Sequence, residues 1–408
     1  MSIAKIQKSI FNGDVTVPAS KSVAHRALIC SFLAGGGTVK PIISSKDMQA
    51  TVGIIEALKN NETELNSIES GSTLRFMIPV AAALGKEVTF TGQGSLLTRP
   101  IGEYLELLPL HGVKINSDGY LPAEISGKLQ NGSFEVNGNV SSQYITGLLL
   151  ALSALEGDSA VILKTQLQSK PYVDMTVKVL ADYGVNVFET DFGYLIKGGQ
   201  KFKVQDYTVE GDWSQAAFFL VGGAINGDVT VNGLDMNSTQ GDKAVVDVIK
   251  KFGANVTILE NAVRVQKSEL HGIEFDATDI PDMVPAIAVL ASFASGKTVI
   301  KGAQRLRYKE SDRIESVVYN LKELGVDVKE TPDGMEISGG RPLHSAKLKG
   351  YNDHRIVMAF SVAAMNIGDC EIDDAQSINK SYPSFFDDYN KLGGKAVSYT
   401  HLRAHETL

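Results

Sequence analysis

The chain has 408 residues, 43% of them hydrophobic, and a formal net charge of −8 at pH 7. This length is enough for two domains with full cores, and the acidic balance argues against a nucleic-acid partner. Residues 1–11 lack the apolar stretch of a signal peptide, and no apolar run is long enough to cross a bilayer. We therefore expect a cytoplasmic protein with no membrane partner, in which Cys30 and Cys370 are buried, reduced thiols.

Residues 18–35 form the first strongly patterned segment: a small polar head, an apolar body of helical length and a terminating glycine. Ser20 is placed to cap a helix and Gly35 to end it. The body is apolar nearly all round, which predicts a helix buried in a core. The head then combines free backbone N–H groups, the positive end of a helix dipole and the cations Lys21 and Arg26. This combination is typical of an anion-binding site.

The same segment recurs five more times along the chain. With heads at positions 20, 71, 141, 212, 282 and 353, the steps between them are 51, 70, 71, 70 and 71 residues. Such a regular period indicates an internal structural repeat.

Each repeat continues in the same manner after its glycine. A short strand such as 228–233 is followed by a polar loop and a second helix. In residues 242–252, Val245, Ile249 and Phe252 share one face, as in a helix that lies on a sheet. A strand and a hairpin then close the repeat. We therefore predict an α/β protein of two domains, each built from three β-α-β-α-β-β units with buried core helices.

Two irregularities indicate how the repeats form domains. The first repeat is short, because residues 59–67 leave no room for a closing hairpin, and the sixth ends near Val397 before its hairpin. Residues 3–6 and 14–17 read as the missing strands.

We therefore expect the trimmed first unit and units two and three to form one domain, residues 18–210. Units four to six, residues 211–397, are expected to form the other domain together with residues 1–17.

The tail 398–408 fits no repeat and resembles translated cloning or sequencing-adapter sequence. We expect it to be non-native or disordered. His401 and His405 stand four residues apart, but a pair without further ligands does not define a metal site.

Cationic side chains gather at the heads and in the loops beside them. Any one alone reads as solvated surface charge, but their repetition at equivalent points of an acidic protein indicates a ligand with several phosphate or carboxylate groups. A helix end contributes only about 0.3–1 kcal/mol to anion binding and a charge-assisted hydrogen bond about 1.5–3 kcal/mol, so side chains should dominate. The set is Lys21, Arg26, Arg75, Arg99, Lys170, Arg305, Arg307, Lys309, Arg313, Arg355 and Lys380.

Acid/base candidates stand among these cations. Asp282 heads the fifth core helix, and Glu310 and Asp312 lie at the start of an outer helix. The structural alternatives are a helix cap for Asp282 and first-turn helix charges for Glu310 and Asp312. No Ser-His-Asp arrangement or nucleophilic cysteine is evident, so acid/base catalysis on an anionic substrate is favoured over covalent catalysis.

In order and spacing, nine motifs resemble the enolpyruvyl transferase family over nearly all of Ile3–Val397. They are Ala19–Ser22 with Arg26, Ser70–Arg75, Thr98–Ile101, Ser141–Gln143, Ser169–Tyr172, Ile280–Asp282, Lys309–Arg313, Asn352–Arg355 and Asn379–Pro383.

The resemblance implies a fold and an activity. Each domain would be an inverse α/β barrel of three units, as the repeat predicts independently. The enolpyruvyl (carboxyvinyl) group of phosphoenolpyruvate would pass to the 5-hydroxyl of shikimate 3-phosphate, with release of phosphate, in an interdomain cleft. This acid/base addition and elimination belongs to the shikimate pathway, which leads to chorismate and the aromatic amino acids. It implies no metal or organic cofactor, and we expect a monomer.

The resemblance also implies roles for individual residues. Asp282, Glu310 and Lys21 match catalytic residues, the first two as the proton-transfer pair. Residues that match contacts to shikimate 3-phosphate are Lys21, Ser22, Arg26, Ser141, Ser142, Gln143, Ser169, Tyr172, Asp282 and Lys309. Residues that match contacts to phosphoenolpyruvate are Lys21, Gly71, Arg99, Gln143, Arg313, Arg355 and Lys380.

The chain departs from the family pattern at Glu69 and Arg305, where Asn occurs in other members, and at Phe76, where Pro is frequent. These differences and the trimmed first unit bear on affinity and glyphosate sensitivity more than on the reaction class.

Two alternatives have the same fold. A UDP-N-acetylglucosamine enolpyruvyl transferase would carry a Lys-Asn pair in the first head and usually a loop cysteine, whereas this head reads Lys21-Ser22. A non-catalytic relative would bind shikimate 3-phosphate without turnover. The presence of Asp282, Glu310 and Lys380 argues against it.

Overall fold

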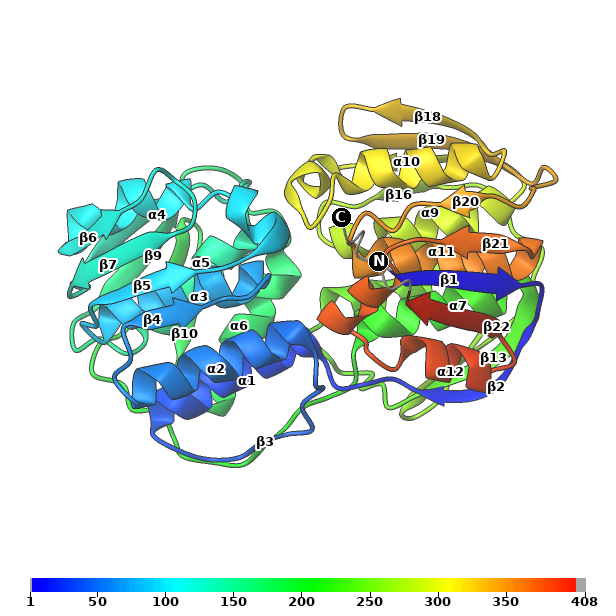
Figure 1. Ribbon diagram of the computed structural model, residues 1–408. Coiled ribbons are helices and arrows are strands. Elements are labelled where there is room, and N and C mark those ends of the chain that lie inside the picture. The colour runs from blue at the N-terminus through cyan, green and yellow to red at the C-terminus, as the bar shows by residue number, and fades with distance from the viewer. Residues whose placement is uncertain (1, 401–408) are drawn as a thin grey trace. The chain divides into compact units, whose positions relative to one another are not determined.

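The computed structural model describes residues 2–400. The chain forms two compact units, one of Met1–Pro18 with Gly211–Leu408 and one of Ala19–Glu210. Each unit alternates core helices, outer helices and small sheets (Figure 1). None of the described helices is long and apolar enough to cross a membrane.

The unit Ala19–Glu210 has three core helices, each followed along the chain by an outer helix. The core helices are α1 (Lys21–Ala34), α3 (Gly71–Ala83) and α5 (Ser142–Leu152), and the outer helices are α2 (Lys46–Lys59), α4 (Gly102–Leu107) and α6 (Lys170–Asp182). One sheet has the order β4 (Glu64–Asn66), β5 (Val88–Thr91), β7 (Ala123–Gly127), β6 (Val113–Asn116). The second has the order β10 (Val187–Thr190), β11 (Gly193–Ile196), β9 (Ser159–Leu163), β8 (Ser133–Val136).

The other unit repeats this plan. Its core helices are α7 (Trp213–Asn226), α9 (Val284–Phe293) and α11 (His354–Ile367), and its outer helices are α8 (Val245–Lys251), α10 (Arg313–Glu323) and α12 (Phe385–Lys391). Its first two sheets have the orders β14 (Asn255–Ile258), β15 (Ala262–Gln266), β13 (Gly227–Asn232), β2 (Phe11–Thr16) and β16 (Glu274–Asp276), β17 (Gly296–Lys301), β19 (Gly334–Gly339), β18 (Asp327–Thr331). The third has the order β20 (Lys347–Leu348), β21 (Cys370–Ile372), β1 (Ser2–Gln7), β22 (Lys395–Thr400).

The predicted β-α-β-α-β-β unit is confirmed as a continuous stretch of chain in three of these sheets, those of β4 to β7, β8 to β11 and β16 to β19. In these three sheets the strands that flank the core helix pair in parallel, and the two strands that follow the outer helix pair antiparallel. The first repeat is trimmed, as predicted: its sheet contains only β3 (Val39–Lys40) in parallel with β12 (Tyr207–Thr208).

The core helices owe their burial to their all-round apolar sequence. In α1, the Ser20 side chain accepts the Val23 N–H and Gly35 ends the helix with φ 81°, so both predicted caps are confirmed. In α3 nearly every residue is buried, Arg75 included. A helix that is buried on all sides places its polar first turn at one end of the core.

The N-terminal strands complete sheets formed by distant sequence. Strand β2 pairs in parallel with β13, and β1 lies between β21 and β22 (Figure 1). The returning strand of the sixth repeat is therefore supplied by the opposite end of the chain.

The expectation that the chain from Ser398 onward lies outside the fold is wrong for Ser398–Thr400. These residues belong to β22, in which Ala4 pairs with Ser398, Ile3 with Tyr399 and Ser2 with Thr400. Strand β22 is the first hairpin strand of the sixth repeat. No hairpin turn follows it in the sequence, because its antiparallel partner is β1 from the N-terminus. His401 and His405 lie outside the described residues.

We predict that Ile6→Ala lowers the free energy of unfolding by about 2–5 kcal/mol, because the Ile6 side chain in β1 is 1% exposed within the core. Ile10→Ala, only a few residues away but 58% exposed, should change it by less than about 0.5 kcal/mol. Urea denaturation of both variants tests this, and equal effects would contradict the placement of β1.

Candidate active site

The head of a core helix contacts the start of the outer helix in its own repeat. In four repeats a hydrogen bond joins the two positions across 26 to 31 residues. The pairs are Lys21 with Asp47, Ser214 with Asp242, Asp282 with Arg313, and the Asn352 carbonyl with Lys380. In these four repeats, polar groups from the two segments therefore meet at the head.

In the unit Ala19–Glu210, the predicted catalytic Lys21 lies in the first turn of α1. Its Nζ is 2.7 Å from Asp47 Oδ2, and both side chains are largely buried. Asp47 belongs to the first turn of α2, where a carboxylate also faces the helix dipole favourably. The ammonium is thus held at one position beside the head.

Arg26 lies one turn further along α1 and is 3% exposed. Its guanidinium donates to Thr176 Oγ1 at 2.8 Å, to the Tyr172 carbonyl at 2.8 Å, to the Ser22 carbonyl at 2.7 Å and to Thr146 Oγ1 at 3.4 Å. It therefore joins α1 to α5 and α6. Burial lowers the pKa of Arg26 to about 10, still well above neutrality, so the group stays charged.

Gln143 is fixed in orientation by two neighbours. Its Nε2 donates to Ser72 Oγ at 2.9 Å, and its Oε1 accepts from Arg75 Nη1 at 2.7 Å. Ser141 caps α5 by accepting the Gln143 backbone N–H. The heads of α3 and α5 are therefore joined through side chains, with Ser142 in the first turn.

Gly71 opens α3 against the guanidinium of Arg99, which is 6% exposed. A Cβ added at Gly71 would overlap that guanidinium. Glu69, the departure from the family pattern, lies by the loop at Gly94, where an added Cβ would be 2.7 Å from the Glu69 carboxyl carbon.

Ser169 precedes α6 with a left-handed backbone, φ 56°, and its carbonyl accepts the Tyr172 N–H at 3.1 Å. The predicted residues of this unit thus come from the starts of α1, α3, α5 and α6 and from the loop that carries Arg99. We call Lys21, Ser22, Arg26, Gly71, Arg99, Ser141, Ser142, Gln143, Ser169 and Tyr172 the first head cluster.

In the unit of Met1–Pro18 with Gly211–Leu408, one buried arginine binds three carboxylates. Arg313 opens α10, and its side chain is 1% exposed. It donates to Asp353 Oδ2 at 2.8 Å, to Asp282 Oδ1 at 2.8 Å and to Glu310 Oε2 at 2.6 Å. Burial opposes the charged guanidinium, but Asp353, Glu310 and Asp282 together raise the pKa of Arg313, which therefore stays cationic.

Asp282 lies in the turn η4 (Pro281–Met283) that precedes α9. Besides Arg313, its carboxylate accepts from Arg355 Nη2 at 3.0 Å, and Lys309 Nζ is 3.7 Å away. Burial by itself raises the pKa of Asp282, but Arg355, Lys309 and Arg313 hold it well below the ordinary value. Asp282 is therefore a carboxylate surrounded by cations.

The structural alternatives for the acidic residues are resolved by these contacts. Asp282 does not cap α9, since the turn before that helix has no side-chain cap. Asp312 is the N-cap of α10 and accepts the backbone N–H groups of Ile314 and Glu315. Glu310 precedes the helix and binds Arg313 instead. Lys380 ends the turn η6 (Ala375–Lys380) and donates to the Asn352 carbonyl at 2.8 Å.

We call Asp282, Lys309, Glu310, Arg313, Arg355 and Lys380 the second head cluster. It combines two partly buried carboxylates with four cations, which suits proton transfer on an anionic substrate.

Known proteins are similar to this chain in sequence and in fold. The model of the family EPSP synthase (3-phosphoshikimate 1-carboxyvinyltransferase) matches residues 6–70 and 59–389. The chain belongs to this family.

Relatives named 3-phosphoshikimate 1-carboxyvinyltransferase include one from Clostridium novyi, 41% identical over 96% of this chain and 97% of its own. Another from Methanothrix thermoacetophila is 38% identical over 98% of this chain and 100% of its own. The EPSP synthase from Acinetobacter baumannii superposes with a TM-score of 0.82 at 27% identity, covering 98% of this chain and 100% of its own. The enolpyruvyl transferase NikO from Streptomyces tendae shares the fold, with a TM-score of 0.80 at 16% identity.

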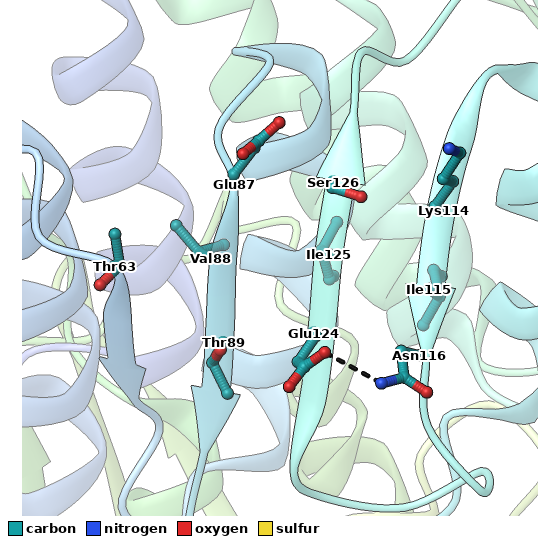
Figure 2. A pocket seen from close by; sticks show the side chains of 10 residues that line it. All are labelled: Thr63, Glu87, Val88, Thr89, Lys114, Ile115, Asn116, Glu124, Ile125 and Ser126. Atoms are coloured by element: carbon teal, nitrogen blue, oxygen red, sulfur yellow. Dashed lines mark hydrogen bonds between the residues drawn. The ribbon is translucent and has the colours of Figure 1, made fainter.

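A hollow of about 410 Å³ lies on the outer face of the sheet β4-β5-β7-β6 (Figure 2). Lys114 lies there with Glu87 and Glu124, and Glu124 accepts a hydrogen bond from Asn116 at 2.9 Å. It contains no predicted site residue, and its charge does not favour an anion.

Three acidic residues that bind head or cluster side chains were not predicted from the sequence: Asp47, Asp353 and Asp242. Asp353 was noted only as a helix head, yet it is fully buried against Arg313. Asp242 is 3% exposed and accepts from Ser214 Oγ. The repeat could have identified Asp47 and Asp242 from the sequence. Each stands at the start of the outer helix of its repeat, the position that Arg313 occupies in the fifth repeat.

We predict that Gly71→Ala raises the KM for phosphoenolpyruvate about tenfold with little loss of stability, because the new methyl group displaces the flexible end of Arg99 rather than backbone. Gly53→Ala is the matched control, since a Cβ there meets nothing within 4 Å. Steady-state kinetics and thermal melts of both variants test this. An unchanged KM in Gly71→Ala would contradict the placement of Arg99.

Proposed function

We propose that the two head clusters carry out the reaction of this family on one pair of substrates. The enolpyruvyl group of phosphoenolpyruvate is transferred to the 5-hydroxyl of shikimate 3-phosphate, and phosphate is released. The observation that carries the proposal is the sharing of Arg313 by Asp282 and Glu310, which holds two carboxylates at one cationic centre.

The first head cluster supplies most contacts to shikimate 3-phosphate, through Lys21, Ser22, Arg26, Ser141, Ser142, Gln143, Ser169 and Tyr172. Asp282 and Lys309 add to them from the second. Arg26 acts chiefly by ordering α1, α5 and α6, because four of its N–H groups are already used within the protein. The groups for phosphoenolpyruvate are Lys21, Gly71, Arg99, Gln143, Arg313, Arg355 and Lys380.

Asp282 and Glu310 exchange protons with the substrates, with Lys21 as the third catalytic group. In the addition step, the hydroxyl oxygen bonds to C2 of phosphoenolpyruvate, the hydroxyl loses its proton, and C3 gains one. In the elimination step, C3 loses a proton and the C2–O bond to phosphate breaks. Two carboxylates fixed beside arginines can serve alternately as acid and base for these steps.

The cations around Asp282 link substrate binding to its proton affinity. With Arg313, Arg355 and Lys309 close by, its low pKa makes the carboxylate a weak base. The phosphate and carboxylate groups of the substrates bring negative charge to the same cations. The proton affinity of Asp282 then rises when the reaction needs a base.

We also propose that the protein acts in the cytoplasm as a monomer, in the shikimate pathway to chorismate and aromatic amino acids. Among residues 2–400 no cluster of three or more His, Cys, Asp or Glu side chains is placed to hold a metal ion.

The proposal predicts phosphate release from phosphoenolpyruvate only when shikimate 3-phosphate is present. Asp282→Ala should lower kcat by about 100-fold or more, the scale of lost acid/base catalysis. Asp279→Ala, an exposed acidic residue on the same segment, should behave as the unmodified protein.

Two results would contradict the proposal. Full activity in Asp282→Ala would remove Asp282 from the chemistry. Binding of shikimate 3-phosphate in calorimetry, without phosphate release by the unmodified protein, would favour a non-catalytic relative.

A further inference from the structure

Arg75 is a buried cation without a role in the account above. It lies in α3, one turn after Gly71, and is 5% exposed. Its Nη1 donates to Gln143 Oε1 at 2.7 Å, and its Nη2 donates to the Pro100 carbonyl at 2.9 Å. One guanidinium therefore joins Gln143, which the proposed function assigns to both substrates, to the residue that follows Arg99.

The Pro100 carbonyl accepts a second hydrogen bond from a different core helix. Tyr144 lies in α5, is 2% exposed and donates its hydroxyl to the same carbonyl at 2.7 Å. The guanidinium carbon of Arg75 also lies 5.2 Å from the centre of the Tyr144 ring, a distance at which a cation and an aromatic face attract. We call Arg75, Tyr144 and the Pro100 carbonyl the carbonyl clamp.

Tyr104, in the outer helix α4, supports both donors of the carbonyl clamp. It is fully buried and donates its hydroxyl to the Arg75 carbonyl at 2.6 Å, and the Tyr144 carbonyl lies 3.3 Å from the same hydroxyl. Burial raises the pKa of Tyr104 well above its ordinary value, so the phenol remains a donor. The main chain of each donor is therefore held beside its side chain.

The carbonyl clamp restricts the backbone that carries Arg99. The backbone of Arg99 is extended, with φ −87° and ψ 125°, as a following proline favours. On the other side of Pro100, the Ile101 N–H donates to the Gly119 carbonyl at 2.9 Å. The Arg99 guanidinium lies against Gly71, where an added Cβ would overlap it. A loop fixed at these points holds that guanidinium at the start of α3.

We propose that Tyr144 is a positioning residue for the binding of phosphoenolpyruvate. Its hydroxyl, together with Arg75, holds the Pro100 carbonyl, and the held carbonyl fixes the Arg99 guanidinium at the head of α3. The inference rests on the proposed role of Arg99 in binding phosphoenolpyruvate. A guanidinium that is already held in place loses little conformational freedom when an anion binds, so the carbonyl clamp favours affinity.

Tyr144→Phe tests the inference, because it removes the hydroxyl and keeps the buried ring. We expect the KM for phosphoenolpyruvate to rise about threefold to tenfold, the range of one lost hydrogen bond. The KM for shikimate 3-phosphate and kcat should stay within about twofold. The melting temperature should change little, since Arg75 still donates to the Pro100 carbonyl.

Tyr207→Phe is the matched control. It removes a hydroxyl that donates to Asp182 Oδ2 at 3.3 Å in the same unit, outside the carbonyl clamp. Both KM values should remain those of the unmodified protein.

A double-mutant cycle with Arg99→Gln shows whether Tyr144 acts through Arg99. In the Arg99→Gln background, Tyr144→Phe should have almost no further effect on kcat/KM for phosphoenolpyruvate, because the guanidinium that it positions is gone.

Three results would overturn the inference. The first is an unchanged KM for phosphoenolpyruvate in Tyr144→Phe. The second is an equal rise in both KM values with a lower melting temperature, which would show a merely structural role. The third is a full effect of Tyr144→Phe in the Arg99→Gln background. Each is distinct from failure of the proposed function, which is read from phosphate release by the unmodified protein and by Asp282→Ala.

Discussion

The second head cluster depends on a single buried guanidinium. Arg313 is almost inaccessible to solvent and binds Asp282, Glu310 and Asp353, which come from three separate segments of the chain. A charge buried in this manner is stable only while its partners remain, and removal of one partner leaves an uncompensated charge. The same ion pairs therefore fix the ends of α9, α10 and α11 and hold the proposed proton-transfer groups in place.

The repeat explains why such a cluster can form. Each unit buries an apolar helix and leaves its polar first turn beside the start of an outer helix. In different repeats a cation, a carboxylate or a hydroxyl stands at these two positions, as in Lys21 with Asp47 and Ser214 with Asp242. The fold thus determines where the polar groups lie, and the side chains determine which charges they present at the heads.

Periodicity alone was enough to predict the repeat unit, the core helices and the trimmed first sheet. It failed at Ser398–Thr400, because β22 pairs with β1 from the other end of the chain and no local turn marks that pairing. The head residues were predictable because they combine charge with a helix start. Asp47, Asp353 and Asp242 were not assigned to the site, because a carboxylate near a helix N-terminus looks like a cap until its long-range cation or hydroxyl partner is known.

The central claim is that anionic ligands release Asp282 from its cations and raise its proton affinity. The most direct measurement is a ¹³C carboxyl NMR titration of Asp282, assigned with Asp282→Asn, with and without shikimate 3-phosphate plus inorganic phosphate, a pair that cannot turn over. The account predicts a pKa well below the ordinary aspartate value in the free protein and a clear rise when both anions are bound. An ordinary pKa in the free protein, or one that anions leave unchanged, would contradict it.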